Sequence, residues 1–197
     1  MKIKKPLALK PHSFCERKVT DLVMTCDTEN SATGMFKSFN LDDINNASAY
    51  KQLFEYYRID KVVVTFRYKS HSYANAVNTL TNINEINPLL YFKVDHNDVA
   101  SDSLLLMRES MKTKEKQLTN NEPNFTIQLK PAVQTEAYKS SVSTTYIPKW
   151  GQWISTDDSS VPHYGLKAYA IAPRTASVDP GQIIVQFKYY ISFKNNE

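Results

Sequence analysis

The stretch that decides the fold is residues 54–66, FEYYRIDKVVVTF. Its first half continues a helical spacing that starts upstream. Four large side chains recur at i, i+3, i+4 and i+7, which predicts one buried helix face: Tyr50, Leu53, Phe54 and Tyr57. Its second half alternates Val62, Val64 and Phe66 with other residues, which predicts a strand with one face in the core. A helix is therefore expected to run straight into a strand, with no glycine or proline between them.

Most of the remaining chain alternates with period two. Three strands are clear, at 183–193, 62–68 and 125–129, and the last is stopped by Pro131. Five weaker candidates lie at 20–26, 35–41, 89–94, 143–147 and 166–171. Eight strands in one domain predict an all-β sandwich or barrel. A second, poorer helix is expected at 101–110 with Ser101 as its cap, and long polar loops are expected at 70–87 and 133–141.

Composition limits the class of protein. The chain has 197 residues, 42% of them hydrophobic, which fits one domain with a sizeable core. The 24 basic and 20 acidic residues give a formal net charge of +4. A protein of this charge can bind phosphate groups, but most proteins of this charge do not. The two cysteines, Cys15 and Cys26, are expected to be free. Because no apolar run approaches about 20 residues, we expect no membrane insertion.

The motifs of catalysis are missing from the sequence. Four histidines are scattered without metal-ligand spacing: His12, His71, His96 and His163. Only four glycines are present, too few for a glycine-rich phosphate loop. The acidic stretch 95–98, DHND, is interpreted as a polar turn after a strand rather than an acid–base cluster. We therefore expect no catalytic residue, no metal, no cofactor and no enzymatic activity.

Several stretches resemble one protein family in both content and order. They are FNLDDI at 39–44, Tyr50, LFEYYRI at 53–59, VVVTF at 62–66, YIPKW at 146–150 with Trp153, PHYGLK at 162–167, and FKYYISF at 187–193. Together they resemble the capsid proteins of circoviruses and related circular single-stranded DNA viruses that encode a replication protein. The helix–strand motif is fairly specific to the family. Each later motif is weak evidence alone, but the order that they share with the family is stronger evidence.

The resemblance implies a single eight-stranded antiparallel jelly roll, with one short helix inserted before a core strand. Such a chain would assemble with its own copies into a small icosahedral shell that packages circular single-stranded DNA. The helix face would then seal the sheet edge or sandwich end. The protein would belong to the virion, with assembly in the host nucleus or cytoplasm, and a host cell-surface receptor or glycan would be a further partner.

The N-terminus departs from the family pattern. Many relatives begin with a long arginine-rich arm, whereas this chain begins MKIKK. We expect residues 1–18 to form a basic arm and residues 19–197 to form the jelly roll. Six cations in the arm are the expected phosphate contacts: Lys2, Lys4, Lys5, Lys10, Arg17 and Lys18. The inner surface of the shell is the second candidate for holding DNA, and aromatic side chains could stack its bases.

Two other classes of protein fit parts of the pattern. A jelly-roll carbohydrate-binding module would account for the strands and for Trp150 and Trp153. A non-assembling single-stranded nucleic-acid-binding protein would account for the charge, although its barrel is normally smaller than this chain. Assembly state separates these alternatives, because only a capsid protein should form large, closed particles.

Overall fold

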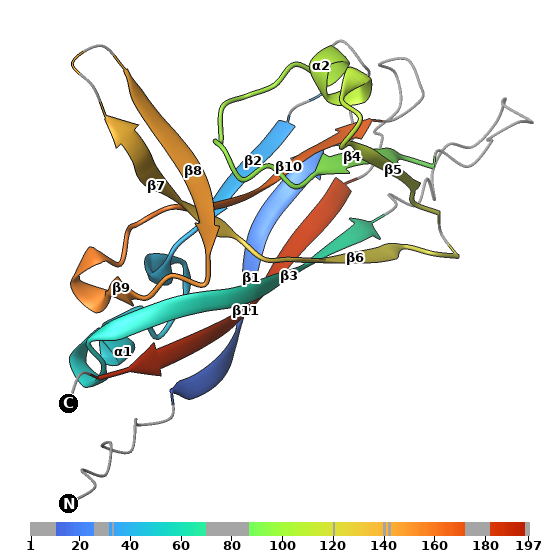
Figure 1. Cartoon of the computed structure of the whole chain (residues 1–197). Helices are drawn as coiled ribbons and strands as arrows, with labels where there is room; N and C mark the ends of the chain where they lie inside the picture. Colours follow the sequence, from blue (N-terminus) through green and yellow to red (C-terminus); the bar gives the residue numbers. More distant parts are fainter. Residues whose placement is uncertain are drawn as a thin grey trace, which may run out of the picture.

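The computed structural model describes residues 11–25, 32, 34–69, 87–119, 121–139, 141, 143–171 and 182–195, without the side chains of 17–22 and 25. Two antiparallel sheets pack face to face (Figure 1). One sheet has the order β1 (His12–Thr25), β11 (Gln182–Lys194), β3 (Tyr56–Lys69), β6 (Asn124–Leu129), with β9 (Ile154–Ser155) beside β3. The other has the order β5 (Lys114–Gln117), β4 (Leu89–Lys93), β10 (His163–Ile171), β7 (Ala132–Lys139), β8 (Thr144–Trp150), with β2 (Gly34–Phe39) also on β10.

This architecture confirms the prediction of an antiparallel jelly roll, but the strand count differs. All eight predicted strands are present, and the described part of the chain adds β5, β7 and β9. The prediction of a loop at 133–141 is wrong for most of its length, because β7 covers residues 132–139. The error arises because the outer half of β7 is exposed on both faces and therefore lacks an apolar alternation. The other predicted loop, at 70–87, lies almost wholly outside the described residues.

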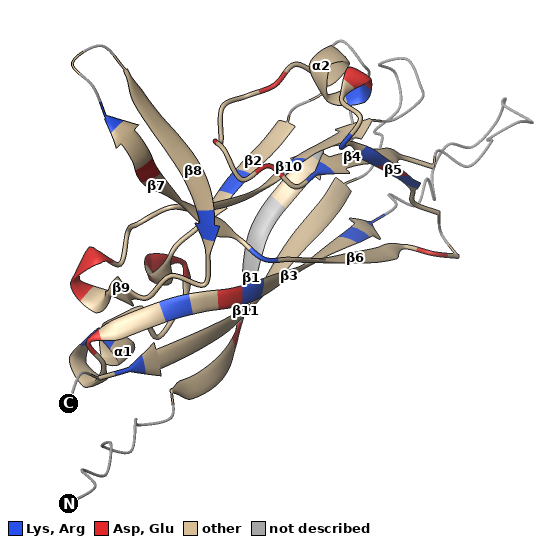
Figure 2. Ribbon diagram, viewed as in Figure 1, with Lys and Arg blue, Asp and Glu red and all other residues tan. Residues whose placement is uncertain are grey.

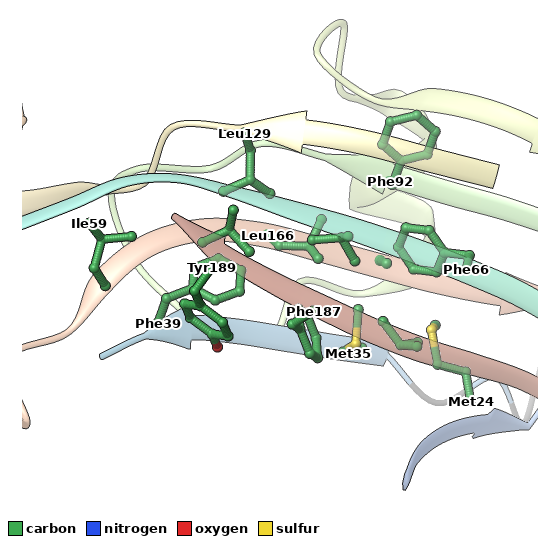
Figure 3. Packing of buried hydrophobic residues seen from close by; sticks show 14 of the residues in the cluster. Met24, Met35, Phe39, Ile59, Phe66, Phe92, Leu129, Leu166, Phe187 and Tyr189 are labelled. Carbon is green, nitrogen blue, oxygen red and sulfur yellow. The ribbon is translucent and has the colours of Figure 1, made fainter. Parts of the chain in front are cut away.

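The core lies between the two sheets and is rich in aromatic rings (Figure 3). Phe39 of β2 meets Phe187 and Tyr189 of β11, with ring centroids 5.7 and 5.9 Å apart and near-perpendicular planes. Such edge-to-face pairs add to the stabilisation that comes from area burial. The Tyr189 hydroxyl donates to Asp43 Oδ2 at 3.1 Å, and burial raises the pKa of Tyr189 far above its usual value. The phenol therefore stays neutral within the core.

The helix prediction is correct in place but wrong in extent. α1 (Ala47–Leu53) ends before Phe54, and Tyr57 lies in β3, where it is fully buried. Leu53 does not belong to the buried face, since its side chain is 64% exposed. Tyr50 and Phe54 do seal the sandwich end: their rings stack on Phe193 with centroids 4.6 and 5.1 Å away. The described residues also include two 3-10 turns, η1 (Leu41–Asp43) and η2 (Thr156–Asp158).

The helix passes into the strand without glycine because other segments satisfy its C-terminal end. Phe54 has extended backbone angles, φ −133° and ψ 145°, and its N–H still donates to Tyr50 O at 3.0 Å. Thr156 Oγ1 donates to Phe54 O at 2.7 Å, and Thr156 N donates to Glu55 O at 2.9 Å. Asn195 Oδ1 accepts from Glu55 N at 3.0 Å. These bonds replace a left-handed C-terminal cap.

The second helix, α2 (Leu104–Glu109), lies over the six-stranded sheet (Figure 1). Its cap is Ser103 rather than the predicted Ser101, because Ser103 Oγ accepts from Leu106 N at 3.2 Å. Met107 is the buried residue of this helix and packs with Tyr91, Tyr169 and Ile171 on the outer side of the sheet. Within the described residues, neither helix is long and apolar enough to cross a membrane.

The sandwich end can be tested by a matched pair of variants, Phe54→Ala and Leu53→Ala. Phe54→Ala removes a ring stacked on Phe193 and should lower the free energy of unfolding by about 3 kcal/mol. Leu53→Ala truncates an exposed side chain and should change it by less than about 0.5 kcal/mol. Urea unfolding of both variants beside the parent measures the difference. Equal stability of the two variants would contradict the stacked geometry.

Candidate nucleic-acid interface

The solvent side of the five-stranded sheet carries a concentration of cations along its two central strands. On β3 and β11, residues that alternate with core positions face solvent, and six of these are basic: Arg58, Lys61, Arg67, Lys69, Lys188 and Lys194. The two strands contain a single acidic residue, Asp60. Figure 2 shows several of these basic positions along the two strands. We call these six residues the basic face.

Aromatic rings lie between the cations of the basic face. Lys61 Nζ lies 4.3 Å and Lys188 Nζ 5.4 Å from the ring centroid of Tyr190. Farther along the sheet, Arg58 Cζ and Lys194 Nζ lie 4.6 and 5.0 Å from the Trp153 ring. Cation–π attraction holds these side chains in place, and the N–H donors that are not used within the sheet can still point outward. The face therefore combines positive charge with ordered aromatic surface.

The strands fix this arrangement through their register. Lys61 is opposite Tyr190 and Val63 is opposite Lys188, so the first cluster forms across adjacent strands. Asp60 accepts from Arg58 Nε at 2.7 Å and from Ser192 Oγ at 2.6 Å, which holds the guanidinium of Arg58 against the sheet. One anion against six cations leaves the face strongly positive. Such a surface suits the phosphates and exposed bases of a single-stranded nucleic acid.

The predicted basic arm is only partly described. Lys2, Lys4, Lys5 and Lys10 lie outside the described residues. Arg17 and Lys18 lie in β1, which begins at His12, and they are opposite Lys188 and Phe187 in the strand register. The strand therefore includes residues 12–18, which the prediction places in the arm. Sequence reasoning named none of the basic face as a site, because its cations are divided between two strands that are far apart in the sequence.

The two tryptophans do not make a single carbohydrate platform. Trp150 meets the ring of His96 edge-on, with centroids 5.3 Å apart. Trp153 is half-buried and instead belongs to the Arg58–Lys194 cluster on the other sheet. Stacking on sugars is therefore not the role that this geometry favours for the pair.

The acidic stretch 95–98 does more than close a strand. Lys167 of β10 is almost fully buried, and its Nζ lies 2.6 Å from Asp98 Oδ1, 3.2 Å from Asp95 Oδ2 and 3.3 Å from Asp102 Oδ1. Lys93 Nζ lies 2.5 Å from Asp102 Oδ2. These ion pairs attach the segment between β4 and α2 to the outer side of the six-stranded sheet. The prediction of a polar turn is correct in conformation but missed this lysine.

The acidic and basic groups of this cluster stabilise one another in their ionised forms. Hydrogen bonding to Lys93 lowers the pKa of Asp102. Burial opposes ionisation of Asp95, but the Asn97 backbone N–H and Lys167 outweigh it and lower the pKa of that carboxyl. Burial likewise disfavours the Lys167 cation, yet Asp98 and Asp95 raise its pKa. Charges that neutralise one another in this way indicate a structural role. Among the described residues, no group of three His, Cys, Asp or Glu side chains could hold a metal ion.

The fold belongs to the class of antiparallel jelly rolls, and the basic face lies on the solvent side of one of its two sheets. The sequence model of the family described as "Circovirus capsid protein" matches residues 13–197, and the chain belongs to this family. A search of the curated proteins gave no match. Membership assigns the chain a structural role as a capsid protein of the virion.

Solved structures show the same fold at low identity. The chain is similar to the capsid protein of BFDV in its 60-mer form, with a TM-score of 0.64, 14% identity and 94% of each chain covered. It is also similar to the decameric BFDV capsid protein, with a TM-score of 0.58, 15% identity, and 94% of this chain and 100% of that chain covered. A third neighbour, tobacco necrosis virus, has a TM-score of 0.52, 11% identity, and 94% and 96% of the two chains covered.

Lys167→Met tests whether the buried ion pairs are structural. Removing the cation breaks the ion pair with Asp98 and leaves Lys93 alone to pair with Asp95 and Asp102, which should lower the free energy of unfolding by about 3 kcal/mol at pH 7. Because the pKa values of both carboxyls are lowered in the folded parent, their contribution is present above about pH 4 and disappears as the pH falls below it. The variant should lose less stability than the parent between about pH 4 and about pH 2.5.

Urea unfolding at about pH 7, 4 and 2.5 measures this difference. Lys112→Met, which changes an exposed lysine, serves as the matched control and should follow the parent. A Lys167→Met variant that is as stable as the parent at neutral pH, and as sensitive to acid, would contradict the ion-pair assignment.

Proposed function

We propose that this capsid protein assembles into a closed icosahedral shell around circular single-stranded DNA, with the basic face turned towards the lumen. The observation that carries the proposal is a set of six cations on the solvent side of β3 and β11, four of which lie over aromatic rings: Arg58, Lys61, Lys188 and Lys194. A duplex hides its bases, whereas a single strand offers both phosphates and stacking surfaces. The face has complementary groups for each.

The N-terminal lysines support the same orientation. Residues 1–10 contain four lysines and no acidic residue, and the chain then enters β1, the edge strand of the sheet that bears the basic face. Lys2, Lys4, Lys5 and Lys10, together with Arg17 and Lys18, would add phosphate contacts that read no sequence. Counterion release from a modest number of cations is multiplied by the number of subunits in the shell.

The opposite sheet would then face away from the genome. Its outer side is covered by α2 and by the segment attached to Lys167, and that ion-pair cluster sets three carboxylates against two lysines, so it offers a polyanion no excess of positive charge. This surface would meet a host receptor or glycan after assembly in the host nucleus or cytoplasm. No step of this function needs a catalytic group.

The basic face predicts a measurable salt dependence. Lys61→Gln with Lys188→Gln removes both cations beside Tyr190 and should weaken binding of a labelled single-stranded oligonucleotide. The log–log slope of affinity against salt should become less steep by roughly 0.7 for each phosphate that is no longer neutralised, so by about 1.4 for the pair. Fluorescence anisotropy across a series of salt concentrations measures the slope. The matched control is Lys112→Gln with Lys114→Gln, at and beside β5 of the other sheet, which should leave the slope unchanged.

The same titration separates the basic face from the arm. Changing Lys2, Lys4 and Lys5 together to Ala should also flatten the slope while leaving shell formation intact. A slope that responds only to the arm variant would remove the basic face from the interface, and a slope that responds only to the Lys61 and Lys188 change would remove the arm. Negative-stain microscopy tests assembly separately: particles no larger than a dimer, across salt and pH, would contradict the shell.

A further inference from the structure

The β7–β8 hairpin projects from the body of the sandwich (Figure 1). Near the body it is anchored: Ala132 and Val133 pair with β10, and Gln134 Nε2 donates to His96 O. Beyond this base, residues 136–139 of β7 and 144–147 of β8 are exposed. A two-stranded hairpin is at best marginally stable in water when nothing packs on it. In the isolated subunit, therefore, the outer half of this hairpin has no packing partner to stabilise it.

Both faces of the outer hairpin are exposed, and the register shows which residues continue the core side of the six-stranded sheet. Val133 is opposite His163 in β10, which is buried and lies beside the core residue Tyr57. Val133 therefore lies on the core side of the six-stranded sheet. Lys149, opposite Val133, lies on this side too, and counting outward the next residues on it are Thr135 with Ile147 and then Tyr138 with Thr145. The core-facing side of the sheet thus continues onto the hairpin.

The residues on this uncovered side are of the kind that a sheet normally buries. The Tyr138 side chain is 60% exposed and Ile147 is 42% exposed, and the threonines beside them carry methyl groups and no charge. We call Thr135, Tyr138, Thr145 and Ile147 the hairpin face. Within the sandwich, the five-stranded sheet covers the equivalent positions. The reverse side adds Tyr146, which is opposite Glu136 and 58% exposed, so the outer hairpin exposes large side chains on both faces. Such a concentration is typical of an interaction surface.

We propose that a second copy of this chain covers the hairpin face in the assembled shell. This inference rests on the proposed function, because only assembly supplies a neighbouring copy at every subunit. Charge disfavours DNA as the occupant: the described hairpin carries Lys139 and Lys149 against Glu136, so it has little net charge, whereas the basic face lies on the other sheet. Edge-to-edge strand pairing is also disfavoured, since Pro148 interrupts the donors of the outermost strand, β8. The hairpin face itself is left to make the contact.

The test pairs a disrupting variant with a control on the same strands. Tyr138→Ser with Ile147→Ser removes both large side chains of the hairpin face and should abolish shells in analytical ultracentrifugation and electron microscopy. Glu136→Gln with Thr144→Ser changes the reverse side and should leave assembly intact. Circular dichroism must show the sheet signal of the parent in both variants. Shells formed by the Tyr138 and Ile147 variant at the parent's yield would overturn the proposal.

A second measurement holds even if the disrupting variant fails to fold. Tyr138 is replaced by the photoreactive p-benzoylphenylalanine, which keeps an aromatic ring, and assembled particles are irradiated. Covalent dimers should form in particles and not in subunits dissociated beforehand, with the crosslink joining position 138 to another copy. Particles that give crosslinks only within one chain, or none, would overturn the inference while leaving the shell itself established. A parent chain that never assembles would instead contradict the proposed function.

Discussion

The pairing of β11 with β3 is the constraint on which the rest of the structure depends. β11 is bonded along its length on both sides, to β1 and to β3, so it is the centre of the five-stranded sheet. Its register with β3 shifts once, between Tyr190 and Ile191, where β3 contains an extra residue at Asp60. Such a bulge changes which residues of a strand face the core. Before it, Tyr57 and Ile59 are buried; after it, Val62, Val64 and Phe66 are buried.

That bulge accounts for the partial failure of the helix prediction. Tyr57 lies seven residues after Tyr50, so it fits the helical spacing, but it is buried because it is the first core residue of β3. The spacing of a helix face and the phase of the strand coincide at this position. No single-sequence pattern separates the two, because the true end of α1 is set by Thr156 and Asn195, which are more than 100 residues away. Sequence reasoning located the element but not its end.

Other features differ in how far they could be predicted. Strands with an apolar alternation, such as β3, β6 and β11, were found because the core imposes that pattern. β7 was missed because its outer half has no core to face. Lys167 was missed because it lies among the apolar residues of β10, and its carboxylate partners come from another segment at 95–102. The basic face could be recognised only after β3 and β11 were known to be neighbours, since each strand alone carries a few ordinary surface lysines.

The basic face and the hairpin face also bear on each other energetically. Six cations on two adjacent strands repel one another, and cation–π contacts and Asp60 offset only part of that repulsion. Bringing many copies together with their basic faces on one side of the shell would add to the repulsion. Contacts between copies through an uncharged surface such as the hairpin face would offset part of that cost. A polyanion bound to the basic face would neutralise these cations and so remove the repulsion between them. Shell closure and nucleic-acid binding would then stabilise each other. A bound nucleic acid would lower the free-energy cost of bringing neighbouring subunits together, and a bound neighbour would in turn favour the binding of nucleic acid.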